Sequence, residues 1–414
     1  MLIIGPPNTA DKLRRRRSPN GEREAAASTP TLPSRPPRGA VSFIDEMDSS
    51  CDSVGIDVPE SLLFRAKEEP IMSNDTRIGV DVAKAVFEIA ISDRPGHIVR
   101  RERAQRAQFL PFMAQQPRAT VVMEACGSAH HWGRKLQDLG HRVVLLPPHH
   151  VRPYICRNKT DRTDAKGILE ASRNEDIRPV PVKTVDQHVL TSLHRLRSGW
   201  MTERTARLNA LRGLLRELGI FIPMGAREVV PMVWSLIEDA DSDLPEALRP
   251  IFAEACREIR EIEARVKQVE RQLEATAEQL PAVGYLRTIP GIGLLIATAL
   301  VAFIGDIRRF PSGRHFASYL GLTPREYSSG LKRNLGRISK RGDGYLRTLL
   351  IHGARSVLLH ARQQQPDRLR EWANNLGKTH VHNKAAVAVA NKLARIVWAV
   401  WSRQQPFVLI AKAA

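Results

Sequence analysis

The sequence predicts an α/β domain followed by two all-α regions, and three observations lead to this fold class. Three short, mostly alternating or apolar stretches lie between residues 77 and 102, with gaps short enough for hairpin turns. Strand and helix patterns then alternate up to about residue 172. From residue 184 onward the apolar residues recur mainly at helical spacing. Three meandering strands followed by alternating helices and strands is the order of a ribonuclease-H-like fold.

Each element of the α/β domain, which we place at residues 75–183, is predicted from its own pattern. Strands are predicted from apolar or alternating runs at 77–82, 85–92, 97–102, 120–124 and 141–146. Helices are predicted at 104–115, at 129–139 and from about residue 160 onward.

The segment that precedes this domain, residues 1–74, differs from the rest in composition. Its first 40 residues hold seven prolines and the arginine run Arg14–Arg17, with almost no apolar periodicity. Such a segment buries too little surface to offset its ordering entropy, so we expect it to be disordered. Because Met72 lies only five residues before the first predicted strand, we also expect this basic, proline-rich extension to be dispensable. The last residues, 407–414, are expected to form a tail.

The region 184–282 is predicted to be helical, with one long helix over 186–218. A second stretch, 245–280, carries apolar residues at alternating steps of four and three, which is a heptad seam. Its members are Leu248, Phe252, Ala255, Ile259, Ile262, Val266, Val269, Leu273, Thr276 and Leu280. Two interpretations remain open: a helical hairpin with the 186–218 helix, or a coiled coil that dimerises the protein.

The C-terminal region, 283–406, is predicted to be small, helical and basic. Between residues 331 and 362 there are eight Lys or Arg and one acid, Asp343. Residues 321–350 are rich in glycine, serine and basic side chains, which favours a flexible loop beside a phosphate backbone. Residues 366–414 are predicted to be helical, with Trp372, Trp398 and Trp401 as packing residues.

The overall charge indicates a polyanionic partner. Lys and Arg number 63 against 44 Asp and Glu, a net charge of +19, and nucleic acid is the most common partner of so basic a protein. Four cysteines without a CxxC pair argue against a disulfide scaffold and a structural zinc site, as fits a reducing cytoplasm. A secretory signal is not expected, and glycines and Pro290 interrupt the uncharged run 288–305, which argues against a membrane span.

Four acidic residues occupy positions that are unusual for charged side chains, two of them in apolar strands. Asp81 lies inside the apolar stretch IGVDVA, Glu124 ends the apolar stretch VVMEA, and Asp161 and Asp164 share one face of a helix. A carboxylate in a core strand is costly unless it is paired or bound to metal. Each acid alone has an ordinary explanation, such as a helix N-terminal charge or an ion pair. Together they predict a Mg²⁺ site, in which two ions about 4 Å apart would serve phosphodiester chemistry.

Two further features predict contacts with nucleic acid. The turn Pro290-Gly291-Ile292-Gly293 opens a helix, and its exposed N–H groups could hold a phosphate; the alternative is that the turn is only a tight connection. We expect backbone contacts from Gly291, Gly293, Lys332, Arg333, Arg337, Lys340, Arg341 and Arg347. Ser328, Ser329 and Ser339 are candidate nucleophiles, and spacing does not choose among them.

Six segments together resemble a known family. They are GVDVAK (79–84), VVMEACGS (121–128), NKTDRTDAKGILEA (158–171), IPGIG (289–293), RRFPSGRHFASYLGLTPREYSSG (308–330) and ISKRGDGYLRTLLIHGA (338–354). In this order and spacing the chain is similar to DEDD-type transposases of bacterial insertion sequences, the insertion sequence 110 family with its 1111 subgroup, kin to Piv-type DNA invertases. The resemblance covers nearly everything from Thr76 to about Pro406.

The resemblance implies a RuvC-like first domain whose four acids are Asp81, Glu124, Asp161 and Asp164, and an active-site serine at Ser329. A coiled-coil part would mediate assembly into a dimer or tetramer, and the C-terminal transposase domain would supply the serine to a composite site. The implied partners are double-stranded DNA and a structured non-coding guide RNA, and the implied location is the bacterial cytoplasm at the nucleoid.

The implied reaction is Mg²⁺-dependent cleavage and exchange of DNA strands. The serine would attack the scissile phosphate, with assistance from a metal or a base. An alternative is a junction-resolving nuclease that uses the four acids and metal-activated water without a serine. A non-catalytic nucleic-acid-binding or packaging protein is the alternative from another class, and it would not need Asp81.

Overall fold

The structure is a computed structural model that describes residues 76–155, 161–330, 332–361 and 367–408. The predicted extension 1–74 and most of the predicted tail lie outside these residues. A five-stranded sheet forms the first domain, with strand order β3-β2-β1-β4-β5. The strands are β1 (Arg77–Asp81), β2 (Val86–Arg94), β3 (His97–Gln105), β4 (Thr120–Glu124) and β5 (Arg142–Leu146). All five predicted strands are therefore present.

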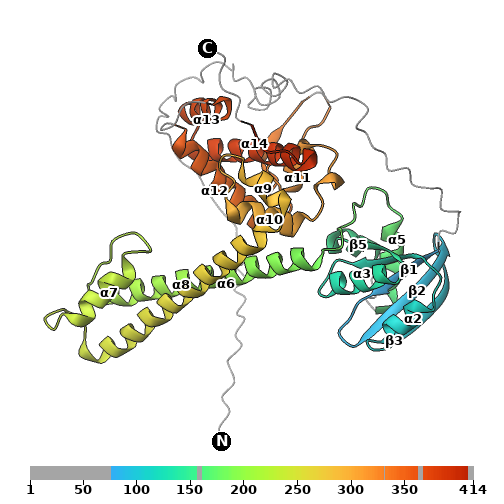
Figure 1. The fold of residues 1–414 in the computed structure, drawn as a ribbon, viewed down its shortest axis with the longest axis horizontal. Coiled ribbons are helices and arrows are strands. Elements are labelled where there is room, and N and C mark those ends of the chain that lie inside the picture. Colours follow the sequence, from blue (N-terminus) through green and yellow to red (C-terminus); the bar gives the residue numbers. More distant parts are fainter. Residues whose placement is uncertain (1–75, 156–160, 331, 362–366, 409–414) are drawn as a thin grey trace, which may run out of the picture. The chain divides into compact units, whose positions relative to one another are not determined.

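The pairing of the strands divides the sheet into two parts. β2 runs antiparallel to both β1 and β3, whereas β4 runs parallel to β1 and β5 runs parallel to β4. The chain thus makes a three-stranded meander and then two crossovers (Figure 1). The predicted α/β class is confirmed, and the expected 104–115 helix is shorter, because β3 extends to Gln105 and α2 begins only at Phe109.

Helices α2 (Phe109–Ala114) and α3 (Ala129–Asp138) cover one face of the sheet. Ile78 and Val80 of β1 point into this layer, together with Phe87 of β2. Phe87, Phe109 and Trp132 meet edge to face, with ring centroids 4.7 to 5.4 Å apart. Such aromatic contacts fix both helices against the sheet.

Helix α5 (Asp161–Ser172) covers the opposite face. Val122 of β4 packs there against Ile168 and Ala171 of α5, and Ala90 of β2 packs against Ala165 and Leu169. The short α4 (Pro148–Val151) and a 3-10 turn at Arg152–Tyr154 lead from β5 toward α5. Since residues alternate between faces along a strand, the positions that face α5 are fixed for every strand of the sheet.

The middle of the chain forms a helical hairpin. α6 (Val185–Glu217) and α8 (Arg249–Glu278) lie side by side, and α7 (Val229–Glu238) packs near their connection (Figure 1). Arg197 pairs with Glu270 at 2.8 Å, and Arg204 pairs with Glu263 at 2.6 Å, so the two helices run antiparallel. The buried α8 residues are Phe252, Cys256, Ile259, Ile262, Val266, Val269, Leu273 and Ala277. The heptad seam therefore packs within one chain, as the hairpin interpretation expects, and a coiled coil between chains stays a prediction.

The C-terminal region is mostly helical. Its helices are α9 (Pro281–Arg287), α10 (Leu294–Ile304), α11 (Gly313–Tyr319), α12 (Gly344–His360), α13 (Arg368–Thr379) and α14 (His382–Arg403). Their core includes Leu190 of α6 and Leu273 of α8, so the hairpin and the C-terminal helices share apolar packing. Trp401 is buried in this core, and the Trp398 indole N–H donates to the Phe310 carbonyl oxygen at 2.9 Å.

One prediction for this region is wrong in part. Residues 321–350 were expected to form a flexible loop, but they contain a two-stranded sheet of β6 (Pro324–Glu326) and β7 (Leu335–Ile338) and the start of α12. The Asp343 carboxylate caps α12 by accepting from the N–H groups of Tyr345 and Leu346 at 2.8 and 3.0 Å. None of the helices in the described part of the chain has the length and apolar character needed to cross a bilayer.

Candidate active site

Two of the predicted acids lie at the ends of neighbouring strands. β1 and β4 are parallel with Val80 opposite Met123, so the next position along each strand places Asp81 beside Glu124. Gly79 of β1 and Val122 of β4 face α5. Because side chains alternate along a strand, Asp81 and Glu124 face the same side. Two carboxylates from separate strands therefore share one end and one face of the sheet.

The third acid reaches the same end because α5 runs antiparallel to β1. The Arg77 guanidinium, at the start of β1, donates to the carbonyl and hydroxyl oxygens of Ser172 at 2.7 and 3.1 Å, at the end of α5. From Ser172 back to Asp164 a helix rises about 12 Å, and from Arg77 on to Asp81 a strand rises about 13 Å. Asp164 therefore lies level with Asp81.

The burial of these acids differs. Asp164 is 9% exposed, whereas Asp81 and Glu124 are half-buried. Asp161 is the first residue of α5, but its side chain lies outside the described residues. Across the described part of the chain, no three His, Cys, Asp or Glu side chains gather closely enough to bind a metal ion. The acids thus share one region of the sheet without the spacing of a formed metal site.

Cys126 is a site residue that the sequence reasoning missed. Its thiol is half-buried two positions after Glu124. Burial, and then the negative charges of Glu124 and Asp81, raise the pKa of the Cys126 thiol. One thiol therefore experiences both carboxylates, which supports their placement at the same end of the sheet. The only sequence signal was its position in the VVMEACGS segment.

Glu88 is a second acid that the sequence reasoning missed. It lies directly opposite Asp81 in the antiparallel pair of β1 and β2, and opposed residues point to the same face. The Glu88 carboxylate accepts a hydrogen bond from the Arg103 guanidinium of β3 at 2.5 Å. Because Arg103 neutralises this carboxylate, Glu88 can tolerate a neighbouring acid without a metal ion.

Ser329 lies in the connection between β6 and β7. Its backbone forms a reciprocal bridge with Lys332, with N···O distances of 3.3 and 3.2 Å. Gly330, within this turn, has φ +55°, which glycine adopts without steric cost. Ser329 is exposed, and among the described residues its hydroxyl has no hydrogen-bond partner. The hydroxyl is therefore presented to solvent at the tip of a hairpin.

The other two candidate serines differ from Ser329. The Ser328 hydroxyl donates to the Glu326 carboxylate at 2.6 Å and accepts from the Asn334 N–H at 3.2 Å. Ser339 is half-buried after β7, and its N–H donates to the Thr323 carbonyl oxygen at 2.7 Å. Ser328 thus holds the hairpin together, and the geometry favours Ser329 as the accessible hydroxyl.

The predicted basic contacts fall into two groups. Lys332, Arg333, Arg337, Lys340 and Arg341 are exposed on or beside the hairpin. In contrast, the half-buried Arg347 donates to the carbonyl oxygens of Leu320 and Arg341 at 3.2 and 3.3 Å. Arg347 therefore secures the loops around the hairpin, which limits its reach toward a phosphate.

The glycines of the predicted phosphate turn also differ. Gly291 has φ +81°, and a β-carbon there would lie 2.6 Å from the Gly353 carbonyl oxygen. Gly293 is the N-cap of α10, and a β-carbon there would meet no atom within 4 Å. Gly291 is thus needed for packing against α12, whereas Gly293 leaves open space in front of the α10 N–H groups.

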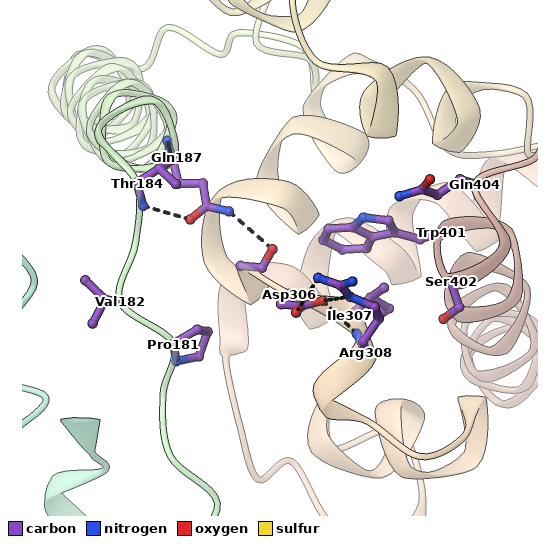
Figure 2. A pocket seen from close by; sticks show the side chains of 11 residues that line it. Pro181, Val182, Thr184, Gln187, Asp306, Ile307, Arg308, Trp401, Ser402 and Gln404 are labelled. Carbon is purple, nitrogen blue, oxygen red and sulfur yellow. Dashed lines mark hydrogen bonds and ion pairs between the residues drawn. The ribbon is translucent and has the colours of Figure 1, made fainter. Parts of the chain in front are cut away.

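A pocket of about 340 Å³ lies away from all of these residues. It is lined by parts of segments 181–187, 305–308 and 401–404 (Figure 2). The Gln187 side chain accepts from the Thr184 N–H at 3.1 Å and donates to the Gly305 carbonyl oxygen at 3.2 Å. Figure 2 shows Gln187 beside Thr184 at the edge of this pocket. These bonds fix the start of α6 beside the C-terminal helices.

Comparisons with known proteins assign the family. A family model described as a transposase matches residues 78–220, and one described as the transposase IS116/IS110/IS902 family matches residues 283–370. A protein of Pseudomonas aeruginosa named probable family 20 transposase is 42% identical over 332 residues, covering 80% of this chain and 98% of that protein. The chain belongs to the IS116/IS110/IS902 family of transposases. It is therefore an enzyme of DNA transposition and recombination.

Two further relatives agree with this transposase assignment. The transposase for insertion sequence element IS1111A of Coxiella burnetii is 37% identical over 330 residues, covering 80% of this chain and 90% of that protein. The pilin gene-inverting protein of Moraxella lacunata is 31% identical over 147 residues, covering 34% of this chain and 45% of that protein. The expected family and its kinship with DNA invertases are confirmed.

Proposed function

We propose that this transposase cleaves and rejoins DNA strands at the ends of its insertion sequence through a composite site of four acids and one serine. The observation that carries the proposal is the common placement of Asp81, Glu124 and Asp164. Two neighbouring strand ends and the antiparallel helix α5 bring these carboxylates to one end of the sheet. The order β3-β2-β1-β4-β5, with a three-stranded meander, also supports a ribonuclease-H-like, RuvC-like catalytic domain.

The donor chemistry of these residues fits Mg²⁺. Carboxylate oxygens are the ligands that this ion prefers. Burial, and after it the charges of Glu124 and Asp81, raise the pKa of the Cys126 thiol, so both carboxylates act on one point at this end of the sheet. Asp81, Glu124, Asp161 and Asp164 would hold the metal, with two ions expected. When bound, Mg²⁺ would polarise the scissile phosphate and stabilise the leaving oxygen.

The serine supplies the nucleophile. The Ser329 oxygen forms a bond to the scissile phosphorus and loses its proton to a base, while the bond from phosphorus to the 3′ oxygen breaks. The 3′ oxygen takes up a proton, which leaves a free 3′-hydroxyl and a phosphoserine joined to the other DNA end. The exposed Ser329 hydroxyl supports this assignment over Ser328, whose hydroxyl is bound to Glu326 and Asn334.

The partners of this reaction follow from charge and from the family. Element ends and target are double-stranded DNA, and the net charge of +19 supports a second nucleic acid, which we take to be a structured non-coding guide RNA. Base pairing would then provide the sequence recognition, and the protein would bind backbones. We take the two parts of the composite site to come from different subunits, and so expect a dimer or tetramer that acts at the nucleoid in the cytoplasm.

The test is a trapped protein–DNA adduct. Full-length protein is incubated with Mg²⁺, an RNA transcribed from the non-coding ends of the element, and an element-end duplex labelled at its 3′ end, and the products are separated on a denaturing gel. We expect a labelled adduct with the wild type and with Ser328→Ala, and none with Ser329→Ala or Asp81→Asn. An adduct that persists in Ser329→Ala overturns the role of this serine. Cleavage without an adduct in Ser329→Ala would favour the alternative, a junction-resolving nuclease that uses metal-activated water.

A further inference from the structure

A group of basic side chains lies where helix α3, the segment 180–184 and the start of α6 meet. We call it the junction cluster, and its members are His130, Arg134, Lys183, His188 and Arg195. None of them belongs to the candidate active site or to the hairpin that carries Ser329. The cluster therefore has no role in the function proposed above.

Lys183 and its neighbours in this cluster contact both the α/β domain and the helices α6 and α10. On the side of the α/β domain, the Arg134 guanidinium donates to the Lys183 carbonyl oxygen at 2.7 Å, and the Lys183 N–H donates to Nδ1 of His130 at 3.2 Å. On the other side, the Lys183 ammonium donates to the Thr191 hydroxyl at 3.2 Å and lies 5.1 Å from the centre of the Phe303 ring. Lys183 thus connects α3 to α6 and α10.

The positive side chains of this cluster have no acid in direct contact with them among the described residues. Within the described residues, the salt bridges include none of the five members. Burial, followed by the nearby positive charges of Lys183 and His188, lowers the pKa of His130 to about 4. Burial and the charge of Arg195 lower the pKa of Lys183 to about 8, with Asp343 as the one acid that opposes this shift.

The cluster is also accessible. His188 and Arg195 are exposed, and they are seven residues apart on α6, so they lie two turns apart on one face of that helix. The rings of His130 and His188 are 6.4 Å apart, which places α3 and α6 next to each other at this point. The α3 members His130 and Arg134 are half-buried, so a ligand bound at the exposed α6 side chains would also reach the part of α3 that is open to solvent.

We propose that the junction cluster binds phosphate groups of a nucleic-acid backbone that passes from α3 to α6. The inference rests on the proposed function, because it requires that the protein holds nucleic acid. Guanidinium and ammonium groups, here those of Arg134, Arg195 and Lys183, and the N–H of a neutral imidazole are donors that bind phosphates, and an anion would relieve the repulsion among the three cations. The phosphates could come from DNA or from RNA, which share this chemistry.

The experiment compares two double variants of the full-length protein. His188→Gln/Arg195→Gln removes the two exposed members of the cluster and leaves the buried ones in place. Arg216→Gln/Arg227→Gln is the matched control, since both residues are exposed at the end of α6 and in its connection to α7, at the other end of this helix from the cluster. The probes are a 30-base-pair DNA duplex and a folded RNA hairpin, and Kd is measured by fluorescence anisotropy over a series of salt concentrations.

We expect the cluster variant to bind at least one probe roughly tenfold more weakly at about 0.1 M salt, with a salt slope shallower by about one or more. The control should keep the wild-type slope, and Arg195→Lys should retain most of the affinity. The probe that the cluster variant binds more weakly than the wild type does, DNA or RNA, identifies the source of the phosphates.

The outcomes separate this inference from the proposed function. If the wild type binds both probes and the cluster variant keeps the same Kd and slope, the junction cluster is not a phosphate site, whereas the proposed function stands. Equal losses of affinity in the cluster variant and the control also overturn the junction-cluster proposal, because the effect would then come from net charge alone. If the wild type binds neither probe, the proposed function is contradicted, and the junction-cluster proposal, which depends on it, is contradicted as well.

Discussion

Gly79 of β1 and Ala165 of α5 approach so closely that a β-carbon on Gly79 would lie 2.7 Å from the Ala165 carbonyl oxygen. The same β-carbon would lie 2.6 Å from the Leu169 side chain. Glycine at this position therefore lets α5 lie directly on β1. The same contact sets the height of α5 along the strand, and so brings Asp164 level with Asp81.

Gly79→Ala should disturb both the fold and the activity. The added methyl group must push α5 away from β1, and overpacking of this kind costs about 1–3 kcal/mol. We expect a lower Tm and a loss of strand cleavage, because Asp164 moves with α5. Thermal unfolding and cleavage of an element-end duplex measure the two effects. Gly199→Ala in α6, where a β-carbon meets no atom within 4 Å, is the control, and it should keep or slightly raise the Tm. Equal behaviour of the two variants would contradict this role of Gly79.

Asp164→Asn should abolish cleavage and preserve the fold. The amide has nearly the same shape as the carboxylate but removes a negative charge and an oxygen ligand. We expect cleavage to fall at least about a hundredfold, since a neutral ligand binds Mg²⁺ poorly, with no decrease in Tm. The control is Asp138→Asn, an exposed acid at the end of α3. Wild-type cleavage rates in Asp164→Asn at several Mg²⁺ concentrations would remove Asp164 from the metal site.

The strands and the candidate acids could be predicted from sequence because their signals are local. Alternation and apolar runs mark β1, β4 and β5, and Asp81 and Glu124 stand out as charges in apolar strands. The β6–β7 hairpin was missed because Arg325, Glu326, Gly336 and Arg337 are exposed, so these short strands carry no alternation between a buried and a solvent face. Their pairing depends on the backbone contact of the Tyr327 N–H with the Asn334 carbonyl oxygen at 2.8 Å.

The sequence could not predict which residues surround the candidate site, because these contacts depend on strand register and on packing between distant segments. Glu88 faces Asp81 only because β1 and β2 pair in one register, and a shift of one residue would turn it to the other face. Likewise, Gly291 is explained by Gly353, which is 62 positions away in the sequence. No local pattern reports such contacts, so the sequence could indicate the candidate residues but not their surroundings.

The pair Gly291 and Gly353 gives a prediction for the turn before α10. A β-carbon on Gly353 of α12 would lie 2.3 Å from the Gly291 carbonyl oxygen. We expect Gly353→Ala to displace this turn, lower the Tm and weaken DNA binding, whereas Gly293→Ala should leave the Tm unchanged and weaken binding only. In Gly293→Ala the new methyl group stands in open space where a phosphate would approach the α10 N–H groups. Thermal unfolding and duplex-binding Kd separate the two cases, and unchanged binding in both variants would contradict the phosphate contact.

The buried His194 of α6 predicts how stability depends on pH. Its Nδ1 lies 3.0 Å from the Tyr345 hydroxyl and its Nε2 lies 3.0 Å from the Thr298 hydroxyl. The Thr298 hydroxyl donates to the Leu294 carbonyl oxygen at 2.7 Å, so it accepts from Nε2–H, and Nδ1 accepts from Tyr345. The neutral ring thus joins α6, α10 and α12.

Burial lowers the pKa of His194 to about 4 from its ordinary value of 6.5. The unfolded chain therefore binds a proton between these values while the folded chain does not, so the stability due to His194 is complete above pH 6.5 and declines as the pH falls toward 4. At pH 5 this loss is about 2 kcal/mol. Urea unfolding of wild type and His194→Gln at pH 7.5 and pH 5 measures it. The variant should be less stable at pH 7.5, but its free energy of unfolding should fall less between pH 7.5 and pH 5, because it lacks His194. His130, whose pKa is also lowered to about 4, is present in both proteins and does not affect the difference between them. Parallel losses in the two proteins would show that His194 is not held neutral by the fold.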